Sequence, residues 1–144
     1  MKYELTEVRS SGGEASIEVP REFFGYVARD VIEVIIDSGG EVLLEFWHLG
    51  EDVRVYVQQR TGKVLAGPGP SDLVFANSSI SQFNRCVQSL TARYPFAAED
   101  AEPEEWALAA LEVEKIVHAI DPPAADDGTF WSDFEAEVSM GDYI

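Results

Sequence analysis

The side chains of this sequence that could do chemistry are few in type and widely spaced. The two histidines, His48 and His118, are separated by most of the chain, and the single cysteine is Cys86. A nucleophilic Ser or Cys needs its base within hydrogen-bond reach, and a zinc site needs several His or Cys ligands at short spacings. Neither pattern occurs, so we expect no catalytic residues, no metal site and no cofactor, and a buried, structural role for Cys86.

Two short segments share only part of a ligand-binding motif. Asp121, Asp126 and Asp127 lack the alternating oxygen ligands and the distal glutamate of an EF-hand loop. Residues 67–70, Gly-Pro-Gly-Pro, lack the Lys-Ser/Thr ending of a phosphate loop, and their prolines have no N–H to donate. We interpret both segments as loops. An enzyme acting on a small substrate in a carboxylate-lined pocket is the least favoured of our functional hypotheses.

Carboxylates are abundant, and they are unevenly distributed. Residues 1–94 hold 13 acidic and 9 basic side chains, whereas residues 95–144 hold 14 acidic side chains and one basic one, Lys115. The net charge of the whole sequence is −17. A field of one sign attracts basic partners and repels nucleic acid and anionic membranes. We therefore expect a basic protein partner, no nucleic-acid binding and no membrane binding. The alternative is an acidic surface that serves solubility.

The densest run of carboxylates lies between two expected helices. We predict that a partner binds the acidic side chains of residues 99–105 and of a nearby loop, namely Glu99, Asp100, Glu102, Glu104, Glu105, Asp126 and Asp127. The alternative for each residue is a solvated linker or a helix start, where Glu104 and Glu105 complement the positive end of the helix dipole.

Length and composition predict one packed domain. A chain of 144 residues with 46% hydrophobic residues can bury a core, and we assign residues 1–144 to a single domain. No apolar run approaches the roughly 20 residues of a membrane span. The first residues carry no basic segment followed by an apolar stretch, and a lone cysteine forms no internal disulfide, so we expect a cytoplasmic location.

The elements that must position these groups begin with a β-rich first half. Alternating apolar and polar residues predict strands near residues 16–19, 41–47, 53–57, 63–66 and 73–76, with turns at Ser38–Gly40 and Thr61–Gly62. Residues 21–37 combine helical spacing of apolar side chains with a β-branched run. There we favour a short helix near residues 20–28 followed by a strand.

The second half of the chain is typical of three helices. Ser79 and Gln82 form a capping box for a helix that ends at Pro95, and Pro103 begins the next one. Thr129 caps the third, which we expect to turn Phe130, Trp131, Phe134 and Val138 inward and Asp133, Glu135 and Glu137 outward. Strands followed by helices predict the α+β fold class, with a mostly antiparallel sheet.

Several motifs also follow one another in an order shared with a known family. Residues 55–64 form a strand–turn–strand unit, residues 74–83 form a strand, an Asn-Ser-Ser helix cap and a first-turn Phe, and Asp121-Pro122 precedes Trp131 and Phe134. This order, over about residues 50–140, resembles the SUKH superfamily and, in its closing segments, the fourth SUKH immunity group. The first 50 residues lack the Leu-Pro and Gly-rich opening of that pattern.

The resemblance implies a curved sheet flanked by helices and a non-catalytic bacterial protein that neutralises a cognate polymorphic toxin, often a nuclease or nucleic-acid deaminase. It supplies no catalytic residues. The recurrent positions have structural roles as a cap, a core aromatic and a helix stop: Asn77, Ser78, Ser79, Phe83, Asp121, Pro122 and Trp131. The alternative hypothesis is a regulatory or scaffolding module of the same fold that binds another protein.

Overall fold

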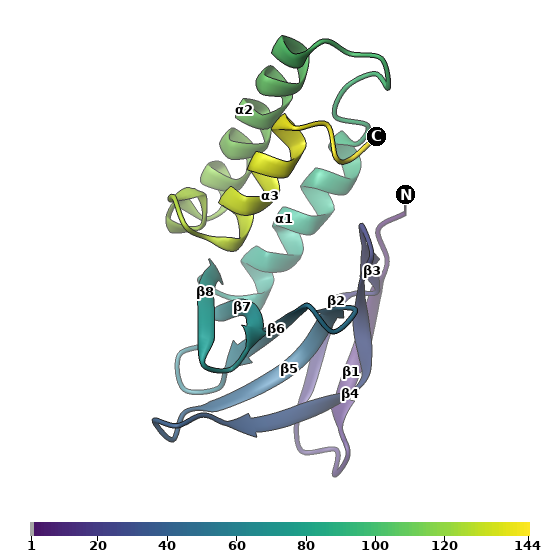
Figure 1. Ribbon diagram of the computed structural model, residues 1–144. Coiled ribbons are helices and arrows are strands. Elements are labelled where there is room, and N and C mark those ends of the chain that lie inside the picture. Colours follow the sequence, from purple (N-terminus) through teal and green to yellow (C-terminus); the bar gives the residue numbers. More distant parts are fainter. Residues whose placement is uncertain (1) are drawn as a thin grey trace.

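An open sheet and a layer of helices make up the computed structural model, which describes residues 2–144 (Figure 1). The sheet has eight strands: β1 (Leu5–Ser10), β2 (Ser16–Pro20), β3 (Glu22–Phe23), β4 (Tyr26–Ile36), β5 (Val42–Leu49), β6 (Val53–Gln58), β7 (Val64–Gly69) and β8 (Asp72–Asn77). Their order is β2-β1-β4-β5-β6-β7-β8, with β3 beside β4. Only β1 and β4 pair in parallel, so the prediction of an α+β fold with a mostly antiparallel sheet is confirmed.

The helices lie together on one side of the sheet, and α1 continues directly from β8 (Figure 1). They are α1 (Ile80–Arg93), α2 (Pro103–Ile120) and α3 (Phe130–Ser139), with a 3₁₀ turn, η1 (Pro122–Ala125), after α2. Within residues 2–144, none of these helices has the length and apolar character needed to cross a membrane.

The helix caps follow the sequence signals closely. The Ser79 hydroxyl oxygen accepts from the backbone N–H of Gln82 at 3.1 Å, and Thr129 and Ser132 form a reciprocal capping box. The second hydrogen bond of the capping box predicted for Ser79 and Gln82 is wrong. The Gln82 amide oxygen accepts from the Ser79 hydroxyl and not from the backbone N–H of Ser79. Its amide nitrogen donates to the Ile120 carbonyl at 3.4 Å and so ties α1 to the end of α2.

The predicted helix near residues 20–28 is wrong, because this segment is a tight hairpin. Phe23 pairs with Tyr26, and the two turn residues Phe24 and Gly25 have φ values of +46° and +87°. Positive φ at both positions is the geometry of a two-residue hairpin turn. The ring centroids of Phe24 and Tyr143 lie 4.6 Å apart, so tertiary packing holds the non-glycine residue Phe24 at positive φ.

Residues 67–70 also differ from the predicted loop. Strand β7 continues through Gly69, and Gly67 pairs with Arg54 of β6. A Cβ atom at Gly67 would lie 1.9 Å from the carbonyl oxygen of Asp72, so the glycine lets β8 approach closely.

Aromatic rings connect the sheet to the helices in the core. The Trp47 ring of β5 stacks on Tyr26 and meets Phe83 of α1 edge-on, each with 5.0 Å between ring centroids. The ring centroids of Phe83 and of Trp131 in α3 lie 6.2 Å apart. The Trp47 indole N–H donates to the carbonyl of Pro20 at 2.8 Å, so its polar atom is satisfied.

Cys86 has the structural role expected of it. The side chain is fully buried on α1, beside Phe83 and Val87 in the main apolar cluster. Burial raises the pKa of its thiol to about 12, so the thiolate that reacts with electrophiles is scarce at neutral pH.

A charged network joins the three central strands outside the main apolar cluster. Glu45 of β5 is fully buried, and its carboxylate lies 2.9 Å from the guanidinium of Arg29 (β4) and 3.3 Å from that of Arg54 (β6). Arg29 also reaches Glu33, and it lies where the register between β4 and β5 shifts. A buried carboxylate is costly unless opposite charges or hydrogen-bond donors compensate it, and the two guanidinium groups do so here.

Candidate partner-binding site

The structure places the seven predicted contact residues at the two ends of α2. Glu99, Asp100 and Glu102 lie in the connection from α1, and Glu104 and Glu105 occupy the first turn of α2, whereas Asp126 and Asp127 follow η1 beyond its other end. All seven are exposed. The 18 residues of α2 span about 27 Å at 1.5 Å per residue, so the two groups form separate acidic surfaces.

Helix formation accounts for some of the carboxylates at the N-terminal end of α2. Pro103 fits the first turn of α2, and Glu104 and Glu105 lie at the positive end of its dipole. Glu102 stands at the N-cap position, yet its side chain makes no capping hydrogen bond. Its carboxylate therefore contributes no capping hydrogen bond to the start of the helix.

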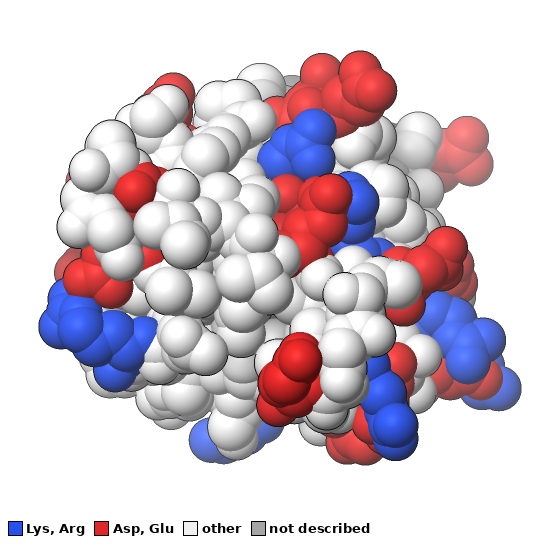
Figure 2. Space-filling view, turned by 90° about the horizontal axis from the view of Figure 1, so that it is seen from below, with Lys and Arg blue, Asp and Glu red and all other residues white. Residues whose placement is uncertain are grey.

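The acidic last third of the chain, residues 95–144, is largely without ion pairs. Of the 14 carboxylates in residues 95–144, only Glu112 forms an ion pair with another described residue, Arg93, at 2.7 Å. The other ion pairs in the described part of the chain join side chains within residues 2–60. Figure 2, seen from below toward the sheet, shows red and blue side chains lying next to one another. Negative potential is thus concentrated on the helical part of the molecule.

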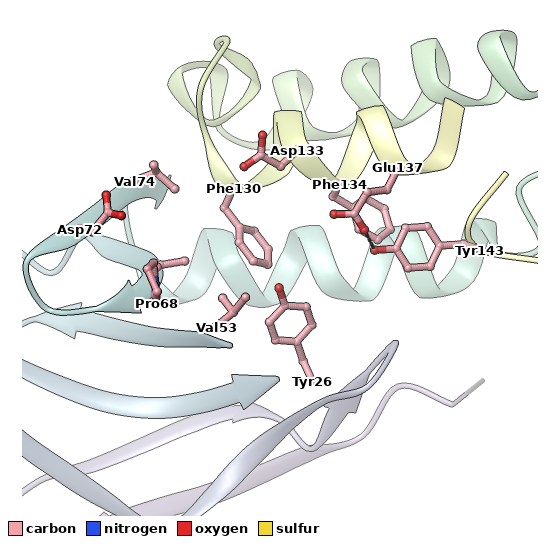
Figure 3. Close-up of a pocket in the computed structure, with 12 residues that line it drawn as sticks. Tyr26, Val53, Pro68, Asp72, Val74, Phe130, Asp133, Phe134, Glu137 and Tyr143 are labelled. Atoms are coloured by element: carbon pink, nitrogen blue, oxygen red, sulfur yellow. Dashed lines mark hydrogen bonds between the residues drawn. The ribbon is translucent and has the colours of Figure 1, made fainter. Parts of the chain in front are cut away.

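A pocket of about 270 Å³ lies between α3 and the sheet (Figure 3). Its walls come from β4, β6, β7, β8, α3 and the C-terminal segment: Tyr26, Val53, Ala66, Gly67, Pro68, Asp72, Val74, Phe130, Asp133, Phe134, Glu137 and Tyr143. Analysis of the sequence did not predict this pocket.

The helical period of α3 brings rings and carboxylates to the same pocket. Phe130, Asp133, Phe134 and Glu137 follow one another at i, i+3, i+4 and i+7, which is one face of a helix. The two phenylalanines are buried, Asp133 is exposed and Glu137 is half-buried. The expectation that Glu137 points simply outward is therefore wrong, and the spacing on α3 was the sequence signal for the pocket.

Two tyrosines complete the aromatic wall. The Tyr26 ring meets Phe130 edge-on at 5.5 Å, and in Figure 3 its hydroxyl points into the cavity. Burial, followed by the charges of Glu137 and Asp133, raises the pKa of Tyr26 to about 12. The Tyr143 hydroxyl donates a hydrogen bond to the Glu137 carboxylate, and burial together with this bond raises the pKa of Tyr143.

The pocket is lined by acidic and aromatic side chains. Three carboxylates line it, from Asp72, Asp133 and Glu137, and no Lys, Arg or His is among its lining residues. Within residues 2–144, no group of three or more His, Cys, Asp and Glu side chains is arranged to hold a metal ion. His48 and His118 lie outside the pocket.

Comparison with known proteins gives one match. A model of the family described as SUKH-4 immunity protein matches residues 37–137, from the end of β4 into α3. Searches of curated proteins and of solved structures found no match. Immunity proteins neutralise toxins by binding them, and they are generally non-catalytic. Because the matched segment is well over half of the sequence, the chain belongs to the SUKH-4 immunity protein family.

Proposed function

We propose that this protein neutralises a toxin of the nuclease or nucleic-acid deaminase type by covering its basic surface with the acidic surfaces at the two ends of α2. The unpaired carboxylates of residues 95–144 are the observation that carries the proposal. An enzyme that acts on nucleic acid binds phosphates through Lys and Arg. Exposed carboxylates can occupy the positions of those phosphates.

The two acidic surfaces can act in one interface. A standard interface buries about 800 Å² on each partner, which corresponds to a patch roughly 30 Å across. Both ends of α2, about 27 Å apart, fit within such a patch. Opposite charges on the two proteins accelerate their encounter, and salt screens this attraction.

The experiment pairs this protein with the toxin encoded beside its gene. We expect a stoichiometric complex that weakens as salt rises, measured by isothermal titration and by inhibition of toxin activity. Reversal of three exposed carboxylates, Glu102→Lys, Glu104→Lys and Glu105→Lys, is expected to weaken the complex by at least tenfold, because attraction becomes repulsion.

A matched control reverses three exposed carboxylates of the strands and turns of the sheet, Glu18→Lys, Glu22→Lys and Glu51→Lys, with the same change in net charge. We expect a smaller loss of affinity from this variant. If both variants lost the same affinity for the toxin, or if the first variant inhibited the toxin as well as the unchanged protein does, the proposed contact through Glu102, Glu104 and Glu105 would be contradicted. A partner that is not a toxin would instead favour the regulatory or scaffolding role.

A further inference from the structure

The pocket between α3 and the sheet carries negative charge without a counter-charge. Asp72, Asp133 and Glu137 line it, and none of the three forms an ion pair among the described residues. Asp72 and Asp133 are exposed and stand at its mouth, whereas Glu137 is half-buried beside Tyr143. Carboxylates that line a partly enclosed space favour a bound cation.

Aromatic rings form the inner wall of the same space. Phe130 and Phe134 are 7% and 4% exposed, and the rings of Tyr26 and Tyr143 line the pocket beside them (Figure 3). Figure 3 shows the Phe130 ring and the Tyr26 hydroxyl projecting between the carboxylates of Asp72 and Glu137. Aromatic faces attract cations through their quadrupole, and the attraction grows when the cation loses water.

The size of the pocket suits a side chain. Its volume of about 270 Å³ far exceeds the roughly 30 Å³ that one water molecule occupies in the liquid. The pocket can therefore admit the head group and part of the stem of a long side chain. It cannot accommodate a folded element.

We propose that this pocket receives one arginine side chain of the partner, whose guanidinium contacts the carboxylates of Asp133 and Glu137 while its plane lies against the rings of Tyr26 and Phe130. This inference rests on the proposed function, since it gives the basic toxin a specific anchor. A buried arginine at the centre of an interface is also a frequent hot spot of binding energy.

Arginine fits this chemistry better than lysine. Its guanidinium is planar, stacks on aromatic rings and presents five N–H donors that can reach two carboxylates at once. A lysine ammonium is a compact and strongly hydrated charge, and it loses more hydration on entering an aromatic pocket. We therefore expect the pocket to discriminate between the two.

The test uses the whole chain of 144 residues and needs no toxin. N-acetyl-arginine amide, N-acetyl-lysine amide and the neutral N-acetyl-citrulline amide are titrated separately, and NMR follows the side-chain signals of Tyr26 and Phe130. The arginine compound is expected to give saturable shifts with weak affinity, at least threefold tighter than the lysine compound. The citrulline compound is expected to give no saturable shift.

Two variants assign the site. Asp133→Asn combined with Glu137→Gln keeps the shapes of both side chains and the acceptor for Tyr143, and we expect arginine affinity to fall at least tenfold. Glu135→Gln, on the same helix but facing Glu114 and Asp127 instead of the pocket, is the control and should bind as the unchanged protein does.

The inference is overturned by an absence of saturable shifts with the arginine compound, by equal binding of lysine or citrulline, or by equal losses in both variants. Because the toxin is absent from these measurements, each of those results would leave the proposed neutralisation standing. Conversely, failure of the toxin complex would leave a measured arginine site in place.

Discussion

The side chain of Asn77 donates a hydrogen bond to the carboxylate of Asp121 at 3.1 Å, across 44 residues of sequence. The same amide accepts from the indole N–H of Trp131 at 2.7 Å. Asp121 also accepts from the backbone and the hydroxyl of Ser78, each at 2.7 Å. Four of the residues that carry the family resemblance, Asn77, Ser78, Asp121 and Trp131, thus form one network that joins the end of β8 and the segment before α1 to the end of α2 and to α3.

Removal of the central amide is expected to destabilise the protein strongly. In Asn77→Ala the Trp131 N–H loses its acceptor and the Asp121 carboxylate loses one donor, and Asn77 is fully buried. Unsatisfied buried groups cost about 1–3 kcal/mol each, so we expect the free energy of unfolding to fall by about 2–4 kcal/mol. Urea denaturation followed by circular dichroism measures it.

The matched control for this prediction is Asn84→Ala on the adjoining helix α1, where the half-buried amide donates to the backbone carbonyl of Glu18. Its expected cost is about 1 kcal/mol. Equal costs for the two variants would show that the network contributes no more than an ordinary surface hydrogen bond.

The buried ion network of the sheet gives a second prediction. Glu45→Ala leaves the half-buried guanidinium groups of Arg29 and Arg54 without their common partner. Loss of one member of a buried ion pair costs about 3–5 kcal/mol, and the partial exposure of both arginines places this variant near the lower value. Thermal and chemical denaturation measure the change.

Glu41→Ala tests whether burial is the cause. Glu41 lies on the turn before β5 and pairs with the exposed side chain of Arg60 at 2.7 Å. Exposed pairs contribute about 0–1 kcal/mol, so this control should have little effect. If Glu41→Ala lowered the free energy of unfolding as much as Glu45→Ala does, burial of the carboxylate would not be the cause of the effect at Glu45.

Glu135 provides a prediction about pH. Burial, and then the neighbouring charges of Glu114 and Asp127, raise the pKa of Glu135 above its usual value of 4.5. Since the folded state holds the proton more tightly than the unfolded state, ionisation of Glu135 lowers stability at neutral pH, and stability is regained as pH falls through the raised pKa. Glu135→Gln should therefore stabilise the protein at neutral pH.

The measurement is the unfolding free energy of both proteins at neutral pH and at a pH below 4.5. The gain from Glu135→Gln should shrink at the lower pH, where both side chains are uncharged. A second variant, Glu114→Gln, should give part of the same gain, and the two gains should not add because they relieve one repulsion. A variant that is less stable than the unchanged protein at neutral pH would disprove the repulsion.

Local signals in the sequence predicted the helical half well. Ser79, Pro103 and Thr129 mark helix starts through hydrogen bonds and dihedral preferences that involve only near neighbours, and all three are found in the structure. The turn at Phe24 and Gly25 was not predicted, because its conformation depends on rings from the far end of the chain, such as Tyr143.

The pocket as a whole could not be predicted from the sequence for the same reason, because the spacing on α3 indicated only one of its walls. Tyr26, Asp72 and Glu137 are far apart along the chain, and only the packing of α3 on the sheet brings them together. Strand β1 was also missed, although it pairs with the next strand, β2, in a local antiparallel hairpin.

The thiol of Cys86 provides a probe of this packing. The side chain is fully buried, burial raises its pKa to about 12, and it is the only cysteine. A disulfide reagent reacts with the thiolate, so we expect the native protein to be labelled only as fast as it opens. In denaturant the thiol should react at the rate of an exposed cysteine.

The Asn77→Ala variant makes this prediction quantitative. The Asn77 amide also contacts the Cys86 sulfur at 3.6 Å, and its loss weakens the packing around the thiol. If opening is rapid compared with labelling, the rate should rise by the factor that corresponds to the lost stability, since about 1.4 kcal/mol is tenfold in the open population. Fast labelling of the unchanged native protein would contradict the buried position of Cys86, because an opening of several kcal/mol must precede the reaction.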